Sequence, residues 1–130
     1  MTESNIIKVV VVMTIAVLCG SIGDIFLKIG MEKIGPVTYK SLHGLLQTGI
    51  AVFKTPQIIL GIVFLAGFFF LWLTLLSWAD LSLVLPLTAL SYIATPILCN
   101  IFLNETVSTL RWTGIIVICV GVVMVTRSGY

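Results

Sequence analysis

Four long apolar runs, separated only by short polar segments, dominate this chain. A helix needs about 20 consecutive apolar residues to cross a membrane. The runs are predicted to be membrane spans at about 6–29, 57–79, 82–103 and 110–126. Because a backbone in lipid must satisfy its own hydrogen bonds, each run is predicted to be helical, although the first begins with β-branched residues. The expected fold is an all-α membrane protein with four transmembrane helices, forming a single domain over residues 1–130.

The composition excludes several classes of protein. Hydrophobic residues make up 59% of the 130 residues and charged residues 9%, with a net charge of +2. A soluble domain has about 25% charged residues, and a nucleic-acid-binding protein needs a clustered basic patch. The sequence contains no Ser/His/Asp set, paired catalytic carboxylates or Cys/His cluster. We therefore expect neither an enzyme, nor a cofactor, metal or nucleic-acid partner.

The connector over residues 30–56 carries much of the charge. Apolar residues recur at helical spacing over 38–54, which predicts a short amphipathic helix lying at the membrane interface. A partly ordered loop is the alternative. Since more Lys and Arg residues fall on the connector side, the positive-inside rule favours a cytoplasmic connector with both termini outside.

Asp24 and Lys28 are ionisable residues four positions apart in the first run, so they share one helix face. A carboxylate within the hydrocarbon region is costly and commonly functional. We therefore consider Asp24 and Lys28 as a candidate substrate-binding or proton site that opens toward the connector. The alternative is an ion pair at the membrane boundary that only ends the helix.

The third run is the candidate pathway helix. Pro86 and Pro96 interrupt its backbone hydrogen bonding, and freed carbonyls are tolerated in lipid only where they meet a neighbour or line a cavity. Thr88, Ser91 and Tyr92 add hydroxyl groups and are candidate substrate-binding residues. Alternatively, the serine and threonine hydroxyls bond only to their own helix backbone.

Small residues mark two candidate helix-packing faces. Gly20 stands four residues from Ala16 and from Asp24, and Gly114 and Gly121 are one heptad apart in the fourth run. Such spacing lets another helix approach closely, within one chain or between two. The alternative is the ordinary frequency of glycine in membrane helices.

Three stretches together resemble the drug/metabolite transporter superfamily, in particular its half-size EamA-like members. They are Gly23-Asp24-Ile25-Phe26-Leu27-Lys28, Leu81-Ser82-Leu83-Val84-Leu85-Pro86 with the later Asn104-Glu105-Thr106, and Trp112-Thr113-Gly114 through Gly121. The resemblance covers nearly the whole chain. It implies a multi-pass transporter in the inner membrane of a prokaryote, working by alternating access as a homodimer or as a heterodimer with a paralogue.

Two branches of the superfamily make different predictions. In small multidrug resistance proteins a membrane glutamate stands where this chain has Gly20, and aromatic residues stand where it has Leu85 and Thr88. The chain is more similar to aminoarabinose-phosphoundecaprenol flippase subunits, which carry glutamine at the position of Asp24. This second resemblance implies a polyprenyl-phosphate-linked sugar as substrate. The alternatives are a proton-coupled exporter of small cationic or amphipathic molecules and a non-transporting subunit that assists a partner.

Overall fold

The computed structural model describes residues 3–37 and 40–128, and its regular elements in these ranges are all helical. They are α1 (Glu3–Ile34), α2 (Leu42–Lys54), α3 (Pro56–Trp78), α4 (Leu81–Leu87), the 3₁₀ turn η1 (Thr88–Leu90), α5 (Ser91–Leu103) and α6 (Thr109–Ser128). Four helical stretches of the described chain are long and apolar enough to cross a membrane, and α4, η1 and α5 together form the third. The prediction of an all-α fold with four potential spans is confirmed.

The first helix is longer than its apolar run. It continues past Gly30 and ends at Ile34, where Gly35 adopts a left-handed conformation with φ of 86° and donates its N–H to the carbonyl of Met31. Gly30 does not end the helix because it is buried against Ile58 of α3. The polar residues of the connector side therefore extend α1 beyond the apolar segment, and a glycine that tolerates positive φ terminates it.

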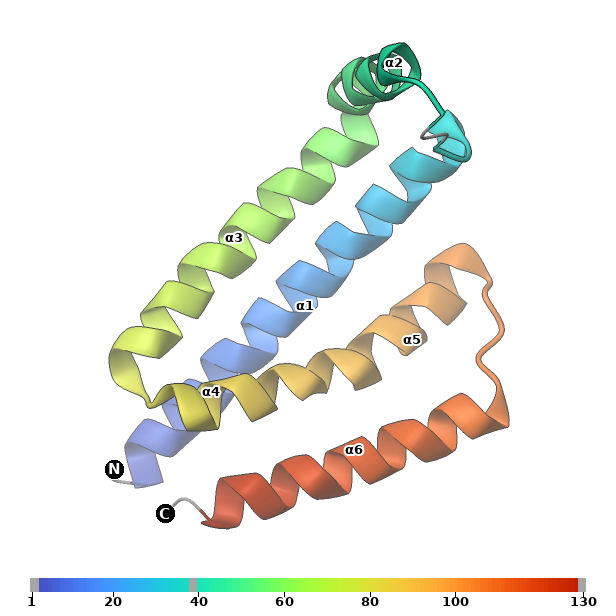
Figure 1. Ribbon diagram of the computed structural model, residues 1–130. Coiled ribbons are helices and arrows are strands. Elements are labelled where there is room, and N and C mark those ends of the chain that lie inside the picture. Colours follow the sequence, from blue (N-terminus) through green and yellow to red (C-terminus); the bar gives the residue numbers. More distant parts are fainter. Residues whose placement is uncertain (1–2, 38–39, 129–130) are drawn as a thin grey trace.

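Helices α1 and α3 form the tightest contact in the bundle (Figure 1). Gly23 and Gly61 face each other there, and a Cβ atom built on Gly61 would lie 2.8 Å from the carbonyl oxygen of Gly23. A Cβ atom on Gly20 would lie 3.2 Å from the ring of Phe68. These glycines let the two backbones approach closely, as is common between membrane helices.

The buried core lies at the end of the bundle that carries both termini, which we call the termini end (Figure 1). It joins α1, α3 and α4 and consists of Val9, Met13, Ala16, Val17, Leu75, Leu83, Val84 and Leu87. At the opposite end, called the connector end, α1 and α3 lie side by side, while α5 packs on α1 and diverges from α6 toward the loop that joins them. Helix α6 packs on α4 and η1, and Ile115 is its one buried residue in the described range.

The connector contains a short helix, α2, whose N-terminus is capped by the hydroxyl of Ser41 accepting from the N–H of Gly44 at 3.1 Å. It has 13 residues and no buried side chain. The helix begins at Leu42, and residues 38 and 39, where the predicted segment began, lie outside the described residues. Its placement at the membrane interface stays a prediction.

The third span changes its helical geometry in the middle. Pro86 lies inside α4, and the chain passes into the 3₁₀ turn η1 two residues later before it resumes as α5. Proline has no N–H to donate, and its ring clashes with the carbonyl one turn back. Short 3₁₀ stretches within a helix commonly mark hinges. Pro96, by contrast, lies within the regular helix α5.

Candidate functional site

A small cavity lies beside Asp24, between α1, α3 and the beginning of the η1–α5 segment. Its volume is about 140 Å³, and it is lined by Val17, Gly20, Ser21, Asp24, Leu65, Phe68, Thr88 and Ser91. We call it the deep cavity. One carboxylate, three hydroxyl groups and one aromatic ring converge there. This combination can hold a small polar group that carries hydrogen-bond donors, because carboxylates and hydroxyl oxygens accept such bonds.

A second cavity adjoins the deep cavity on the connector side of Asp24. It has a volume of about 270 Å³ and is lined by Asp24, Ile25, Lys28, Thr95, Cys99, Leu103 and Glu105. We call it the connector cavity. Asp24 lines both cavities, so its side chain stands at their junction. Two carboxylates and one ammonium group line this open cavity, which suits a headgroup that carries charges of both signs.

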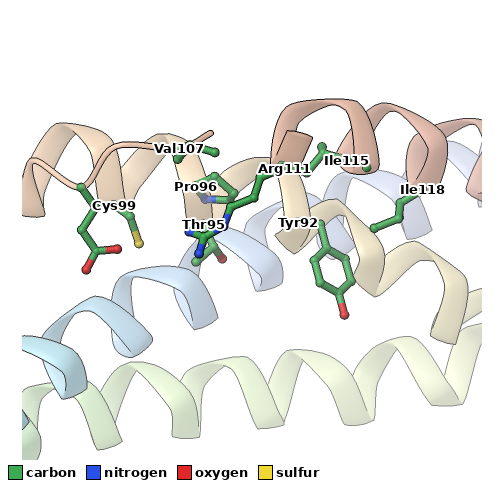
Figure 2. Close-up of a pocket in the computed structure, with 10 residues that line it drawn as sticks. Tyr92, Thr95, Pro96, Cys99, Val107, Arg111, Ile115 and Ile118 are labelled. Atoms are coloured by element: carbon green, nitrogen blue, oxygen red, sulfur yellow. The ribbon is translucent and has the colours of Figure 1, made fainter. Parts of the chain in front are cut away.

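A third cavity, called the α5–α6 groove, separates these two helices (Figure 2). It has a volume of about 360 Å³ and is lined by Tyr92, Thr95, Pro96, Cys99, Glu105, Val107, Arg111, Gly114, Ile115 and Ile118. One stripe of α5 faces one stripe of α6, and Arg111 extends from the first turn of α6 toward α5. The walls are mainly apolar, whereas Glu105 and Arg111 place charge at the connector end.

The groove and the connector cavity are contiguous, because Thr95, Cys99 and Glu105 line both of them. Local backbone geometry fixes Glu105 at this junction. Asn104 ends α5 in a left-handed conformation with φ of 52°, which asparagine tolerates better than most residues. The carboxamide of Asn100 then donates to the carbonyl oxygen of Glu105 at 3.1 Å.

The core closes these cavities from the termini end. A separate cavity of about 550 Å³ is present there, lined by Asn5, Lys8, Val9 and Trp78. These residues come from the first turns of α1 and the last turn of α3, and Val9 belongs to the buried core. The larger cavity is therefore a feature of the helix ends, whereas the cavities that share Asp24 are lined by residues from the middle and the connector end of the helices.

Comparison with known families now identifies the architecture. The EamA-like transporter family matches the chain over residues 7–127, which is nearly its whole length. The chain belongs to the EamA-like transporter family. It is a multi-pass membrane transporter of the drug/metabolite superfamily, and its helices are long and apolar enough for that role. No curated protein and no solved structure matches it significantly.

The structure of this EamA-like transporter places the predicted substrate-binding residues in three adjoining spaces. Thr88 and Ser91 line the deep cavity together with Asp24, while Lys28 lines the connector cavity. Tyr92, 56% exposed, lines the α5–α6 groove instead. The hydroxyl of Thr88 also donates to the carbonyl of Leu85 at 2.6 Å, so it bonds to its own helix while it lines the cavity.

Lys28 and Asp24 do not form an ion pair in the described chain. The Nζ atom of Lys28 lies 3.6 Å from Oε1 of Glu32, and the two side chains are 53% and 57% exposed. The helix also continues well beyond both residues. The geometry thus differs from the alternative in which an Asp24–Lys28 pair ends the helix, and the carboxylate of Asp24 is left facing the two cavities.

The three predicted packing glycines have different surroundings in the transporter. Gly20 is buried against Phe68 of the same chain. Gly114 and Gly121 have no atom of this chain within 4 Å of a Cβ position, and both are exposed on α6. Gly114 also lines the α5–α6 groove, so the face of α6 that carries both glycines borders this groove and is open to another helix or to lipid.

Several cavity-lining residues were not selected from the sequence. They are Ser21, Phe68, Glu105 and Arg111. The helical spacing gave a signal for Ser21, which lies three residues before Asp24 and so on nearly the same face. The positions of Glu105 and Arg111 depend on how the 104–108 turn folds, and periodicity contains no information about that turn.

Proposed function

We propose that this transporter moves an amphiphilic, lipid-linked substrate between membrane leaflets, with a polyprenyl-phosphate-linked sugar as the preferred class. The observation that carries the proposal is the continuity of the connector cavity with the α5–α6 groove through Thr95, Cys99 and Glu105. A polar headgroup placed in the first space has an apolar channel beside it for its hydrocarbon chain.

The residues fit the parts of such a molecule. Lys28 and Arg111 bring positive charge to the connector end, where they attract a phosphate. The hydroxyls of Thr88 and Ser91 offer hydrogen bonds to sugar hydroxyls, and Asp24 accepts from an amino group. Tyr92, Ile115 and Ile118 contact the hydrocarbon chain in the groove.

We propose that two copies, or one copy and a paralogue, form the working unit. A single chain provides one wall of a polar pathway, and the face of α6 that carries Gly114 and Gly121 borders the α5–α6 groove without close contact to the rest of its own chain. A second chain on this face gives the pathway its other wall, and alternating access then exposes the site to each side in turn. The proposed location is the inner membrane of a prokaryote, with the connector in the cytoplasm.

A binding experiment with Lys28→Ala tests the lipid-linked substrate. We expect polyprenyl phosphate at 100 times its Kd to stabilise the purified protein in detergent by about 2.7 kcal/mol. Loss of one partly exposed charge should weaken the affinity about tenfold, which corresponds to about 1.4 kcal/mol. Lys54→Ala is the matched control, because Lys54 is also exposed but lines none of these cavities. Equal affinities of the two variants would contradict the phosphate-binding role of Lys28.

The second candidate function is proton-coupled export of small cationic or amphipathic molecules. One observation favours it, namely that the carboxylate of Asp24 and the ring of Phe68 line the same small cavity. A cation is attracted both to a carboxylate and to an aromatic face. On this alternative, Asp24→Asn abolishes the pH dependence of binding of an aromatic quaternary ammonium ion. A pH profile that is the same in Asp24→Asn and in the unmodified protein would exclude it.

A further inference from the structure

One hydrogen bond crosses the boundary between the deep cavity and the connector cavity. The hydroxyls of Ser21 on α1 and Thr95 on α5 lie 3.0 Å apart. Ser21 lines the deep cavity, and Thr95 lines the connector cavity. Ser21 is only 2% exposed, and it is the buried polar residue among those described. The bonded pair therefore forms part of the wall beside Asp24, which is the residue common to both spaces.

The two helices joined by this bond are held very differently. Helix α1 packs tightly on α3 and contributes four residues to the buried core. Helix α5 has no buried residue, whereas α4 on the other side of η1 contributes Leu83, Val84 and Leu87 to the core. The part of the third span beyond η1 lies against α1 without burying any residue of its own, and the 3₁₀ turn after Pro86 provides a point about which it can turn.

Within the described chain, the Ser21–Thr95 bond is the one side-chain hydrogen bond that joins α1 to α5. Several other hydroxyls of the spans bond to carbonyls of their own helices, as those of Thr14 on α1 and of Thr74 and Ser77 on α3 do. A hydroxyl that bonds across helices instead of back onto its own helix contributes to the distance between those helices.

We propose that the Ser21–Thr95 hydrogen bond is a latch between the deep cavity and the connector cavity, and that it breaks when α5 turns about η1 to admit the headgroup. This inference rests on the proposed function of the same site and adds how access to that site is controlled. When the latch is open, the deep and connector cavities merge around Asp24. When it is closed, the deep cavity is separated from the groove.

The expected strength of the bond suits a latch that must open in every cycle. Interhelical hydroxyl bonds in membranes shift an equilibrium by about threefold on average. Removal of one partner should therefore raise the population of the open state by about threefold while the bundle stays folded. Thr95→Val and Ser21→Ala are suitable changes, because each removes the hydroxyl and adds no bulk.

Access to the deep cavity can be measured without any substrate. Ser91→Cys places a thiol in the wall of the deep cavity, in a chain whose Cys19, Cys99 and Cys119 are replaced by serine. The probe is a small quaternary-ammonium methanethiosulfonate reagent, applied to the purified protein in detergent. We expect Thr95→Val, and independently Ser21→Ala, to raise the rate of labelling about threefold.

Thr74→Val and Ser77→Ala are the matched controls, since their hydroxyls bond only within α3. The proposal is overturned if neither latch variant is labelled faster than its control. Because no substrate is present, this result is independent of whether polyprenyl phosphates are transported.

A second experiment locks the latch. The double variant Ser21→Cys with Thr95→Cys, in the same cysteine-replaced chain, is oxidised to a disulfide in liposomes. We expect flipping of a fluorescent polyprenyl-phosphate sugar to stop on oxidation and to return with dithiothreitol, while each single variant is insensitive to both reagents. The latch is overturned if the oxidised double variant flips the substrate as fast as the same variant does after treatment with dithiothreitol. Absence of flipping by the unmodified protein contradicts the proposed function instead, and the labelling rates still decide about the latch.

Discussion

The close contact between α1 and α3 predicts that Gly61→Ala lowers the stability of the transporter relative to Gly49→Ala. A Cβ atom at this position would lie 2.8 Å from the carbonyl oxygen of Gly23 and 2.9 Å from the side chain of Leu27. The leucine can rotate away, but the carbonyl belongs to the backbone of α1 and cannot. The two helices must therefore move apart along the tightest contact of the bundle.

The expected loss of unfolding free energy follows from comparison with a glycine that has open space around its Cβ position. Alanine is favoured over glycine in a helix by about 1 kcal/mol wherever it is placed. Gly49 of α2 has nothing within 4 Å of its Cβ position, so Gly49→Ala gains only this preference. Overpacking of a filled contact costs about 1–3 kcal/mol. The free energy of unfolding should thus be lower for Gly61→Ala than for Gly49→Ala by about 1–3 kcal/mol.

The assay is unfolding of the purified protein in mixed micelles with increasing mole fractions of sodium dodecyl sulfate, followed by circular dichroism and by tryptophan fluorescence. Gly61→Ala and Gly49→Ala are measured side by side with the unmodified chain. If the two variants have the same free energy of unfolding, the inferred backbone contact between α1 and α3 is wrong.

Two further predictions concern the third and fourth spans. Gly121→Leu should convert dimers into monomers, which chemical cross-linking in liposomes measures. It should change the stability of the single chain by less than about 0.5 kcal/mol, because a Cβ atom at Gly121 meets nothing in its own chain within 4 Å. Persistence of the dimer would place the partner on another face. Pro86→Ala restores a backbone N–H donor in α4 and should raise the stability of that helix by up to about 3 kcal/mol. It should also slow transport. An unchanged transport rate would contradict the role of η1 as a hinge.

The sequence was sufficient to predict the spans because lipid imposes one solution on long apolar runs. The helix ends were less predictable, since they depend on local backbone geometry and not on apolarity. Gly30 illustrates this difference. In the sequence it stands where the apolar run gives way to charged residues, but in the structure it is buried against Ile58 and the helix ends only at Gly35.

The candidate site could be predicted from the sequence only in part. An intramembrane carboxylate such as Asp24 is conspicuous because it is costly to bury, and its helix face can be read from spacing. Its surroundings depend on which helices approach, and on a turn near Asn104 that sets the position of Glu105. Lys28 shows the limit of spacing alone. Asp24 and Glu32 are each four residues from Lys28, and the structure pairs Lys28 with Glu32.

The helices that form the buried core differ from the helices that form most of the groove. Helices α1, α3 and α4 share the buried core, so a disturbance there is expected to affect folding before transport. Helix α5 has no buried residue and α6 has one in the described range, yet these two helices carry the groove and half of the connector cavity. Elements that move are drawn from the less stable parts of a protein. The residues proposed to attract the substrate therefore lie on both sides of this division, with Asp24 and Lys28 on α1, and Thr95, Glu105 and Arg111 on α5, the turn after it and α6. A substrate that contacts both sides at once favours their closure around it, which is the coupling that alternating access requires.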